Sequence, residues 1–385
     1  MFGIYVHVPF CLRKCGYCDF YSEAGCGEPE MDRYVDRLLR EAELLCSAYP
    51  HLKDSAADTI FFGGGTPTAL GADRLLVLLA SLRRTFRVTG SAEVTVEANP
   101  GTVTLESLTV LRRGGFNRLS LGVQSFHPET LELLGRIHGA GEIRDAIRDA
   151  RRAGIRNVGI DLIFGIPSQT VVEWGYDLHM AETFLPEHLS AYALTPEAGT
   201  PLGDALAAGA LTMPDETTIA EMYELARRTL STAGYVQYET SNFARPGRES
   251  RHNRKYWRRD EVAALGPAAH GLLFPPGGRA PYGIATESPR STADWGRNID
   301  ADKAPWRETV RSADDAWVEA LIAGLREIEG VDLSEIIRRD GPMPAAQRNA
   351  VDRLVAAGKL HRDVDRIRIP ENMLFLANEL LADLV

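Results

Sequence analysis

The chain has little cysteine, no excess of basic residues and no long apolar run. Five cysteines in 385 residues, an odd number with three crowded together, do not suit a disulfide framework and favour a reducing compartment. Lys and Arg total 43 against 53 Asp and Glu, a net charge of -10 that argues against broad nucleic-acid binding. No run approaches the roughly 18 apolar residues of a membrane span, and the first residues do not resemble a secretory signal. We therefore expect a cytoplasmic protein without a membrane span.

Short apolar or β-branched runs alternate with stretches of helical periodicity, a pattern typical of parallel β/α units. We count six such runs, too few for the usual eight-unit barrel. The sequence thus predicts an α/β fold, a partial (β/α)6 TIM-like barrel that is open on one side. The six runs are Gly3–Val8, Thr59–Gly63, Glu93–Glu97, Arg118–Gly122, Asn157–Ile163 and His188–Ala193. The helices expected between them are Met31–Ala48, Ala72–Thr85, Thr104–Gly114, Ala140–Ala153 and Thr170–Leu185.

The pattern changes after residue 240. Residues 242–257 read as loop and partial strand, and a Gly/Pro-rich passage over 266–289 is expected to skirt the main domain. Helical periodicity returns from residue 312, with a β wing expected over 359–369 and a last helix from Glu371. We expect three parts: a partial barrel over 1–240, a linking and wrapping segment over 241–305, and a small helical, winged-helix-like domain over 306–385.

Three cysteines, Cys11, Cys15 and Cys18, form a C-x3-C-x2-C triplet directly after the first predicted strand. Ligand sites of parallel β/α folds lie at the carboxyl ends of the strands, so the triplet occupies an active-site position. A cubane iron-sulfur cluster usually takes four thiolates, and three leave one iron open to a small molecule. A structural zinc site completed by His7 or a distant residue is the alternative.

The loops after the next strands place glycine and polar residues at the same edge. Gly63-Gly64-Gly65-Thr66-Pro67 is either a tight strand-to-helix turn or a loop whose missing side chains let backbone groups approach a ligand. Glu97 ends the third strand, where a carboxylate either accepts hydrogen bonds from ribose hydroxyls or stays solvated. Gln124 and Asp161 follow at the ends of the fourth and fifth strands.

The cysteine loop, its lead-in Tyr-Val-His-Val-Pro-Phe over 5–10 and the glycine motif resemble the radical S-adenosylmethionine (SAM) superfamily, in its oxygen-independent coproporphyrinogen III oxidase branch. In that superfamily SAM chelates the open iron of a [4Fe-4S] cluster, and electron transfer cleaves its sulfonium to a 5'-deoxyadenosyl radical. The resemblance implies that the three cysteines hold the cluster and that a flavodoxin or ferredoxin donates electrons. The SAM contacts it implies are Tyr5, Tyr17, Gly64, Gly65, Thr66, Glu97, Gln124, Arg136, Asp161 and Thr195.

Arg136 is the natural partner of the SAM carboxylate, because a guanidinium binds a carboxylate bidentately. A salt bridge on a helix surface is the alternative for this arginine.

Two departures separate the chain from the oxidases of this branch. Those enzymes carry a further cysteine two residues after the triplet, where this chain has Phe20, and a longer segment before the cluster motif. Asp19-Phe20-Tyr21, the pattern His252-Asn253-x-x-Tyr256-Trp257 and residues 371–381 resemble the heme chaperone branch instead. This resemblance implies a protein that binds heme and delivers it to an acceptor such as a respiratory hemoprotein. Oxidative decarboxylation of coproporphyrinogen III is the alternative.

His252 is the first candidate for a heme contact, through iron or propionate, since imidazole is a common heme ligand. A hydrogen bond to a loop is the alternative, as core packing is for Tyr256 and Trp257. Cys26 and Cys46 are expected to be bystanders, the latter as a small buried hydrophobe.

Overall fold

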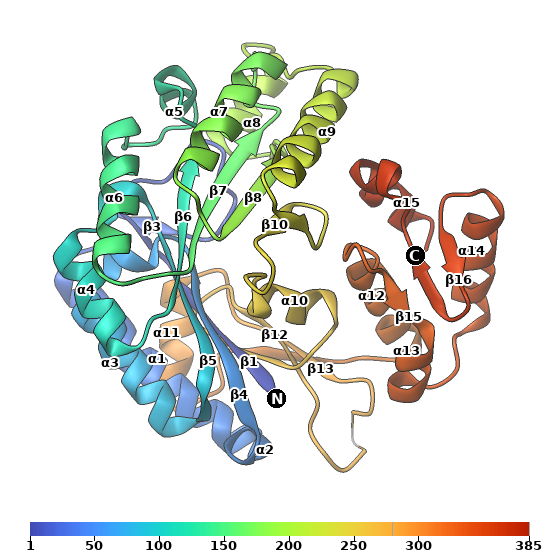
Figure 1. The fold of residues 1–385 in the computed structure, drawn as a ribbon. Helices are drawn as coiled ribbons and strands as arrows, with labels where there is room; N and C mark the ends of the chain where they lie inside the picture. Colours follow the sequence, from blue (N-terminus) through green and yellow to red (C-terminus); the bar gives the residue numbers. More distant parts are fainter. Residues whose placement is uncertain (279, 385) are drawn as a thin grey trace.

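The computed structural model describes residues 1–278 and 280–384. Its centre is a set of six adjacent strands that all run parallel, at the positions that the sequence predicts (Figure 1). Most of their residues are buried, as in parallel sheets covered on both faces, and this explains their apolar, β-branched composition. The strands are β1 (Phe2–Val8), β4 (Ala56–Gly64), β5 (Arg87–Ala98), β6 (Arg118–Gln124), β7 (Val158–Phe164) and β8 (His188–Ala193).

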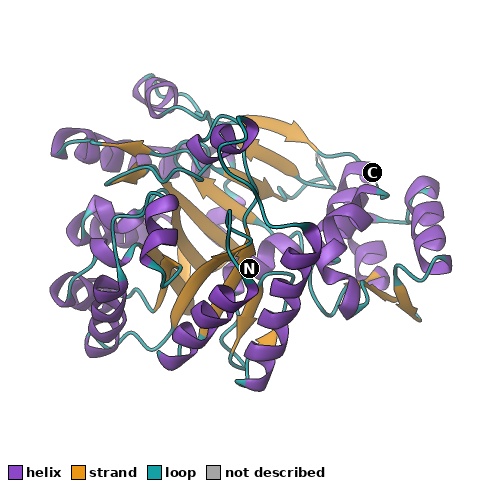
Figure 2. Cartoon of the chain, turned by 90° about the horizontal axis from the view of Figure 1, so that it is seen from above, coloured by secondary structure: helices purple, strands orange, loops and turns teal. Residues whose placement is uncertain are grey.

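Helices connect these strands and cover the outer side of the curved sheet (Figure 2). Local signals set their ends: the hydroxyl of Thr104 caps one helix by accepting from Ser107 N, and Gly115 ends the same helix with a φ of 108°. The longer helices are α1 (Glu28–Ala48), α3 (Ala72–Thr85), α4 (Leu105–Gly114), α6 (Ala140–Arg152), α7 (Val171–Thr183) and α9 (Glu216–Thr232). The shorter ones are α2 (His51–Asp54), η1 (Pro67–Leu70), η2 (Pro100–Thr102), α5 (Pro128–Leu133), α8 (Pro201–Ala207) and α11 (Thr292–Asp300).

Further strands extend the sheet at both edges. They are β9 (Val236–Gln237), β10 (Asn242–Ala244), β11 (Val262–Leu265), β12 (His270–Leu273), β13 (Ile284–Glu287) and β14 (Arg307–Val310). Within the described residues the sheet has twelve strands in the order β14-β13-β12-β11-β1-β4-β5-β6-β7-β8-β10-β9. The expectation that residues 266–289 merely skirt the main domain is therefore wrong, because β12 and β13 belong to its sheet.

The expectation of loop and partial strand over the His252 motif is also wrong, because Arg251–Trp257 forms helix α10. Ser250 caps this helix by accepting from Asn253 N, and Lys255 makes an ion pair of 2.8 Å with Asp58 at the side of β4. Tertiary contacts stabilise this helix despite a sequence of modest helix propensity.

The last part of the chain lies beside the barrel (Figure 1) and confirms the expected helices and β wing. Glu327 joins it to the barrel side, accepting from Arg254 at 2.8 Å and from Arg258 at 3.2 Å. The boundaries at 240 and 305 remain predictions. The elements are α12 (Ala313–Gly324), α13 (Leu333–Asp340), α14 (Ala345–Ala356), η3 (Glu371–Leu376) and α15 (Ala377–Ala382), with the small sheet β15 (Val331–Asp332), β17 (Arg366–Arg368) and β16 (His361–Asp363). None of the described helices is long and apolar enough to span a membrane.

Candidate functional site

The cysteine loop leaves the carboxyl end of β1 and is closed at its base by two short parallel strands, β2 (Phe10–Cys11) and β3 (Glu23–Ala24). His7 fixes the position of this loop through a hydrogen bond. Its Nε2 donates to the carbonyl of Tyr21 over 2.9 Å, so Nδ1 is the acceptor for the Tyr5 hydroxyl at 3.1 Å. Burial lowers the pKa of His7, which favours this neutral ring. The pair Tyr5 and His7 thus orients the cysteine loop.

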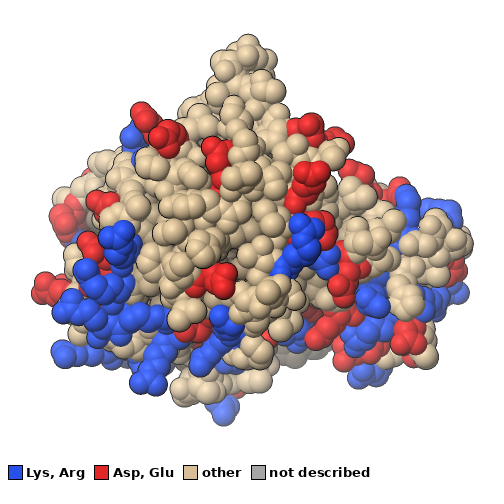
Figure 3. Space-filling model, turned by 45° about the horizontal axis from the view of Figure 1, so that its top comes forward, with Lys and Arg blue, Asp and Glu red and all other residues tan. Residues whose placement is uncertain are grey.

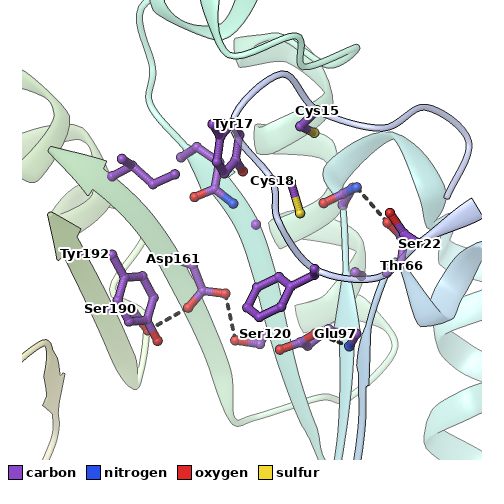
Figure 4. Close-up of a pocket in the computed structure, with 18 of the residues that line it drawn as sticks. Cys15, Tyr17, Cys18, Ser22, Thr66, Glu97, Ser120, Asp161, Ser190 and Tyr192 are labelled. Carbon is purple, nitrogen blue, oxygen red and sulfur yellow. Dashed lines mark hydrogen bonds between the residues drawn. The ribbon is translucent and has the colours of Figure 1, made fainter. Parts of the chain in front are cut away.

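The three cysteines line one cavity of about 480 Å³ at the carboxyl ends of the strands. Figure 4 shows two of them, Cys15 and Cys18, at this cavity. Each side chain is partly exposed, and Cys18 N donates to Cys15 O over 3.3 Å. No three His, Cys, Asp or Glu side chains of the described residues gather as ligands of a single metal ion. A cubane cluster binds each thiolate through a different iron, so its ligands spread around the cluster and need not converge on one atom.

The glycine motif packs directly against the segment that leads into the cysteine loop. Gly65 N donates to Val8 O at 2.8 Å, and Thr66 N donates to Phe10 O at 2.7 Å. Gly64 has a φ of 107°, and a Cβ on it would lie 2.7 Å from the His7 ring. A Cβ on Gly65 would lie 2.8 Å from Phe10 O. The glycines are therefore required by this close backbone approach, which brings the motif to the cysteines.

A hydrogen-bonded chain of side chains connects two of the cysteines. Arg136 donates from Nη1 to Cys15 Sγ at 3.2 Å and from Nη2 to Asn99 Oδ1 at 2.7 Å. Asn99 Nδ2 donates to Thr66 Oγ1 at 3.0 Å, and this hydroxyl lies 3.5 Å from Cys11 Sγ. Arg136 is therefore part of the cysteine site and not of a helix surface.

Two partly buried carboxyl groups, Glu97 and Asp161, face the middle of the cavity (Figure 4). Burial, and then the charge of Asp161, raises the pKa of Glu97 to about 8, while Gly64 N donates to its Oε2 at 3.3 Å. Asp161 accepts from Ser120 at 3.0 Å and from Ser190 at 2.6 Å, and burial raises its pKa. Both groups can accept hydrogen bonds from the hydroxyls of a polar ligand.

The residues present fit a three-thiolate cluster with SAM. Arg136 retains a buried Nε with no partner among the described residues, which leaves a donor for an anionic ligand group. Gln124 has a φ of 70° where β6 loses register with β7, a strained conformation of the kind found at ligand sites. Around one cavity lie three thiols that can bind iron, a guanidinium that can bind a carboxylate, and two carboxyl groups that can accept from hydroxyls. These side chains complement the iron of a cluster and the carboxylate and hydroxyls of SAM.

The structure brings together most of the residues predicted for the site. Those that line the cavity are Cys11, Cys15, Cys18, Tyr17, Gly64, Gly65, Thr66, Glu97, Gln124, Arg136, Asp161 and Thr195. Tyr5 and His252 do not line it. His252 is 1% exposed, and its ring stacks on the ring of Phe61 with the two centroids 5.2 Å apart.

Both ring nitrogens of His252 have protein partners. Nδ1 lies 2.8 Å from Thr59 Oγ1 and Nε2 lies 3.2 Å from the Tyr256 hydroxyl. In this arrangement His252 has no nitrogen available to a heme iron. Its side chain supports Phe61, which does line the cavity.

Sequence reasoning missed several residues on the inner face of the barrel. Those on β6 and β8 occupy alternate positions of a single strand, and this period of two is the signal that could have identified them. The missed cavity residues are Phe61, Asn99, Arg118, Ser120, His188, Ser190, Tyr192, Ser250 and Asn253.

The chain is similar to several known proteins. The family model "Radical SAM superfamily" matches residues 5–181. "Heme chaperone HemW" of Escherichia coli is 35% identical over 98% of this chain and 97% of that protein, and the Mycobacterium tuberculosis protein of the same name is 41% identical over 71% of this chain and 70% of its own length. "Radical S-adenosyl methionine domain-containing protein 1, mitochondrial" of mouse is 34% identical over 86% of this chain and 74% of that protein. Among solved structures, coproporphyrinogen III oxidase (HemN) of E. coli matches 100% of this chain and 89% of its own, with a TM-score of 0.83 and 24% identity, and shows the shared fold.

Proposed function

The chain belongs to the radical SAM superfamily and, within it, to the family of the HemW proteins, and from this premise we propose that it is a heme chaperone, which binds heme and transfers it to an acceptor protein. The observation that carries the proposal is the likeness to proteins named heme chaperones over nearly the whole length of both chains. The acceptor we propose is a hemoprotein such as a respiratory enzyme, and the proposed place of transfer is the cytoplasm.

In this proposal Cys11, Cys15 and Cys18 hold a [4Fe-4S] cluster whose fourth iron binds SAM exchangeably. Together the cluster and SAM supply one-electron chemistry, with a flavodoxin or ferredoxin as electron donor. Arg136 orients the SAM carboxylate through its remaining donor, and Glu97 accepts from the ribose hydroxyls. This assignment is supported by the cavity that all these side chains share.

Two further features support heme as the cargo. Phe20, which stands where the related oxidases carry a fourth cysteine, lines the cavity and is 69% exposed. Tyr192 also lines the cavity and is 40% exposed, so aromatic surface is available in the cavity. Figure 3 shows a face of the molecule whose upper middle part carries few charged side chains. A porphyrin ring, which is planar and largely apolar, suits such a surface.

The proposal is tested by hemin titration of the anaerobically reconstituted protein, followed by incubation with SAM, a reductant and coproporphyrinogen III. We expect a saturable Soret band and no protoporphyrinogen IX. Turnover of coproporphyrinogen III at catalytic rates would contradict the proposal and favour the oxidase alternative. Failure to bind hemin at micromolar concentration would contradict it as well.

A further inference from the structure

The base of the cavity carries a second group of polar side chains, far from the cysteines. Arg118 begins β6 and His188 begins β8, and both are only 2% exposed although they line the cavity. Arg118 lies six positions before Gln124, so its backbone is roughly 20 Å along β6 from the strand end that carries Gln124. The base therefore lies toward the opposite strand ends from the cysteine loop, and Asp161, on the middle of β7, lies between the two parts.

Arg118 is a buried cation, and no carboxylate in the described part of the chain forms an ion pair with it. Its Nη1 donates to the carbonyl of Arg248 at 3.1 Å and to Asn157 Oδ1 at 3.4 Å, and its Nε has no partner among the described residues. Asp161, a carboxyl group on which the charge of Arg118 acts, accepts hydrogen bonds from two serine hydroxyls. A buried charge of this kind costs several kcal/mol unless an anion pairs with it.

His188 supplies a second donor beside this cation. Its Nε2 lies 2.8 Å from the hydroxyl of Tyr238, and that oxygen accepts from Ser250 N at 3.3 Å. The hydroxyl proton has no other acceptor within the described part of the chain, so it is donated to Nε2 and the ring proton sits on Nδ1. Burial, and then the charge of Arg118, lowers the pKa of His188 and favours the neutral ring. Its Nδ1 has no partner in the described residues.

A glycine keeps side-chain volume away from this nitrogen. Gly159, on β7, has no side chain, and a Cβ built on it would lie 3.5 Å from both His188 Nδ1 and Ser120 Oγ. A larger side chain at this position would therefore crowd the unpartnered nitrogen of His188. The side chain of Asn253 lines the same cavity from α10.

We propose that Arg118 and His188 form a carboxylate-binding subsite at the base of the cavity. One carboxylate neutralises the guanidinium and accepts hydrogen bonds from both unpartnered donors, with its two oxygens directed to different strands. The proposal deepens the proposed function and rests on it in one respect, because a heme propionate is the carboxylate that a heme chaperone would present. A small free carboxylate is the other source of the same chemistry.

The test compares hemin with hemin dimethyl ester, which lacks free carboxylates, on the cluster-replete protein. We expect wild type to bind hemin at least about tenfold more tightly than the ester, because a charged hydrogen-bonded pair is lost with the ester. Arg118→Gln abolishes this preference and leaves affinity for the ester unchanged, while the exposed Arg113→Gln keeps the preference. Arg118→Lys keeps the positive charge but lacks the guanidinium Nε, so it gives an intermediate ratio of hemin affinity to ester affinity.

A second arm uses succinate and a thermal melt, so that the subsite is tested even if hemin does not bind. Succinate raises the Tm of wild type but not of Arg118→Gln if the source is a free carboxylate. A preference for hemin over its ester that depends on Arg118 assigns the subsite to propionate. Equal affinities for hemin and ester, together with no succinate effect that depends on Arg118, would overturn the subsite. If hemin does not bind but succinate raises the Tm in a way that depends on Arg118, the proposed function is contradicted and the subsite is retained.

Discussion

Arg136 donates to the sulfur of Cys15 across 3.2 Å, so a guanidinium lies against one of the three thiols of the triplet. Through Asn99 and Thr66 the same side chain is connected to Cys11, on the other side of the loop. The cluster loop and the polar residues of the barrel therefore form one hydrogen-bonded unit, although β5 and β6 lie far from the triplet in the sequence. The predictions below test the parts of this unit and the helices that support it.

Replacing Cys15 by Ala should abolish assembly of the [4Fe-4S] cluster, because two thiolates do not hold the cubane securely. Iron and acid-labile sulfide are measured after anaerobic reconstitution, together with the visible spectrum. Cys26→Ala is the matched control and should retain full iron content. A complete cluster spectrum in Cys15→Ala would show that the ligand assignment is wrong.

Replacing Arg136 by Gln should weaken SAM binding by about tenfold to a hundredfold, the effect of losing one hydrogen bond to a charged group. Iron content should stay close to that of wild type, since all three thiols remain. Isothermal titration of the cluster-replete protein with SAM gives the affinity. Arg152→Gln, which alters an exposed arginine on α6, is the control, and unchanged SAM affinity in Arg136→Gln would remove this residue from the SAM site.

Replacing Glu41 by Gln should stabilise the protein at high pH and have little effect at low pH. Glu41 is fully buried on α1, accepts from Gly266 N at 2.7 Å, and has its pKa raised by burial to about 8. A raised carboxyl pKa contributes stability below about pH 4.5 that is lost as the pH rises through 8. At pH 9 the free energy of unfolding should favour the variant by on the order of 5 kcal/mol, the value of a pKa change from 4.5 to about 8.

Thermal melts at pH 5 and pH 9 measure this difference for Glu41→Gln. The exposed Glu43→Gln on the same helix should show the same small effect at both pH values. An equal change in Tm at the two pH values in Glu41→Gln would mean that the carboxyl does not titrate in this range.

Replacing His252 by Ala should lower stability by roughly 2 to 4 kcal/mol, because it empties a buried site and removes two side-chain hydrogen bonds. Hemin affinity should change less than about twofold, since neither ring nitrogen is free to bind iron. A thermal melt and a Soret titration separate the two effects. His361→Ala on exposed β16 should alter neither, and a loss of hemin affinity at unchanged Tm in His252→Ala would make this histidine a heme contact.

The six central strands could be predicted from the sequence because buried parallel strands consist of apolar, β-branched residues that stand out from their surroundings. Helix α10 could not, because its stability depends on the Ser250 cap and on the ion pair between Lys255 and Asp58. The sequence of this helix carries charged and aromatic residues without a repeating apolar face. Here tertiary contacts outweigh local propensity.

The cysteines and glycines of the site could be predicted because their spacing is specific, whereas the base of the cavity could not. Arg118 and His188 are the first residues of two predicted strands, and their side chains continue the alternate polar positions of β6 and β8. Only the curvature of the sheet brings the starts of β6 and β8 to one cavity. The period of two indicates which residues face inward, but it does not indicate which of them meet at one site.

Transfer of heme to an acceptor tests the central claim most directly. The hemin-loaded, cluster-replete chain is mixed with a heme-free respiratory hemoprotein, the two are separated by size, and the Soret absorbance of each is followed in time. The account predicts that heme leaves the chain and appears on the acceptor, while coproporphyrinogen III added under the same conditions stays unchanged. Heme that remains on the chain, or coproporphyrinogen III converted at catalytic rates, would contradict it.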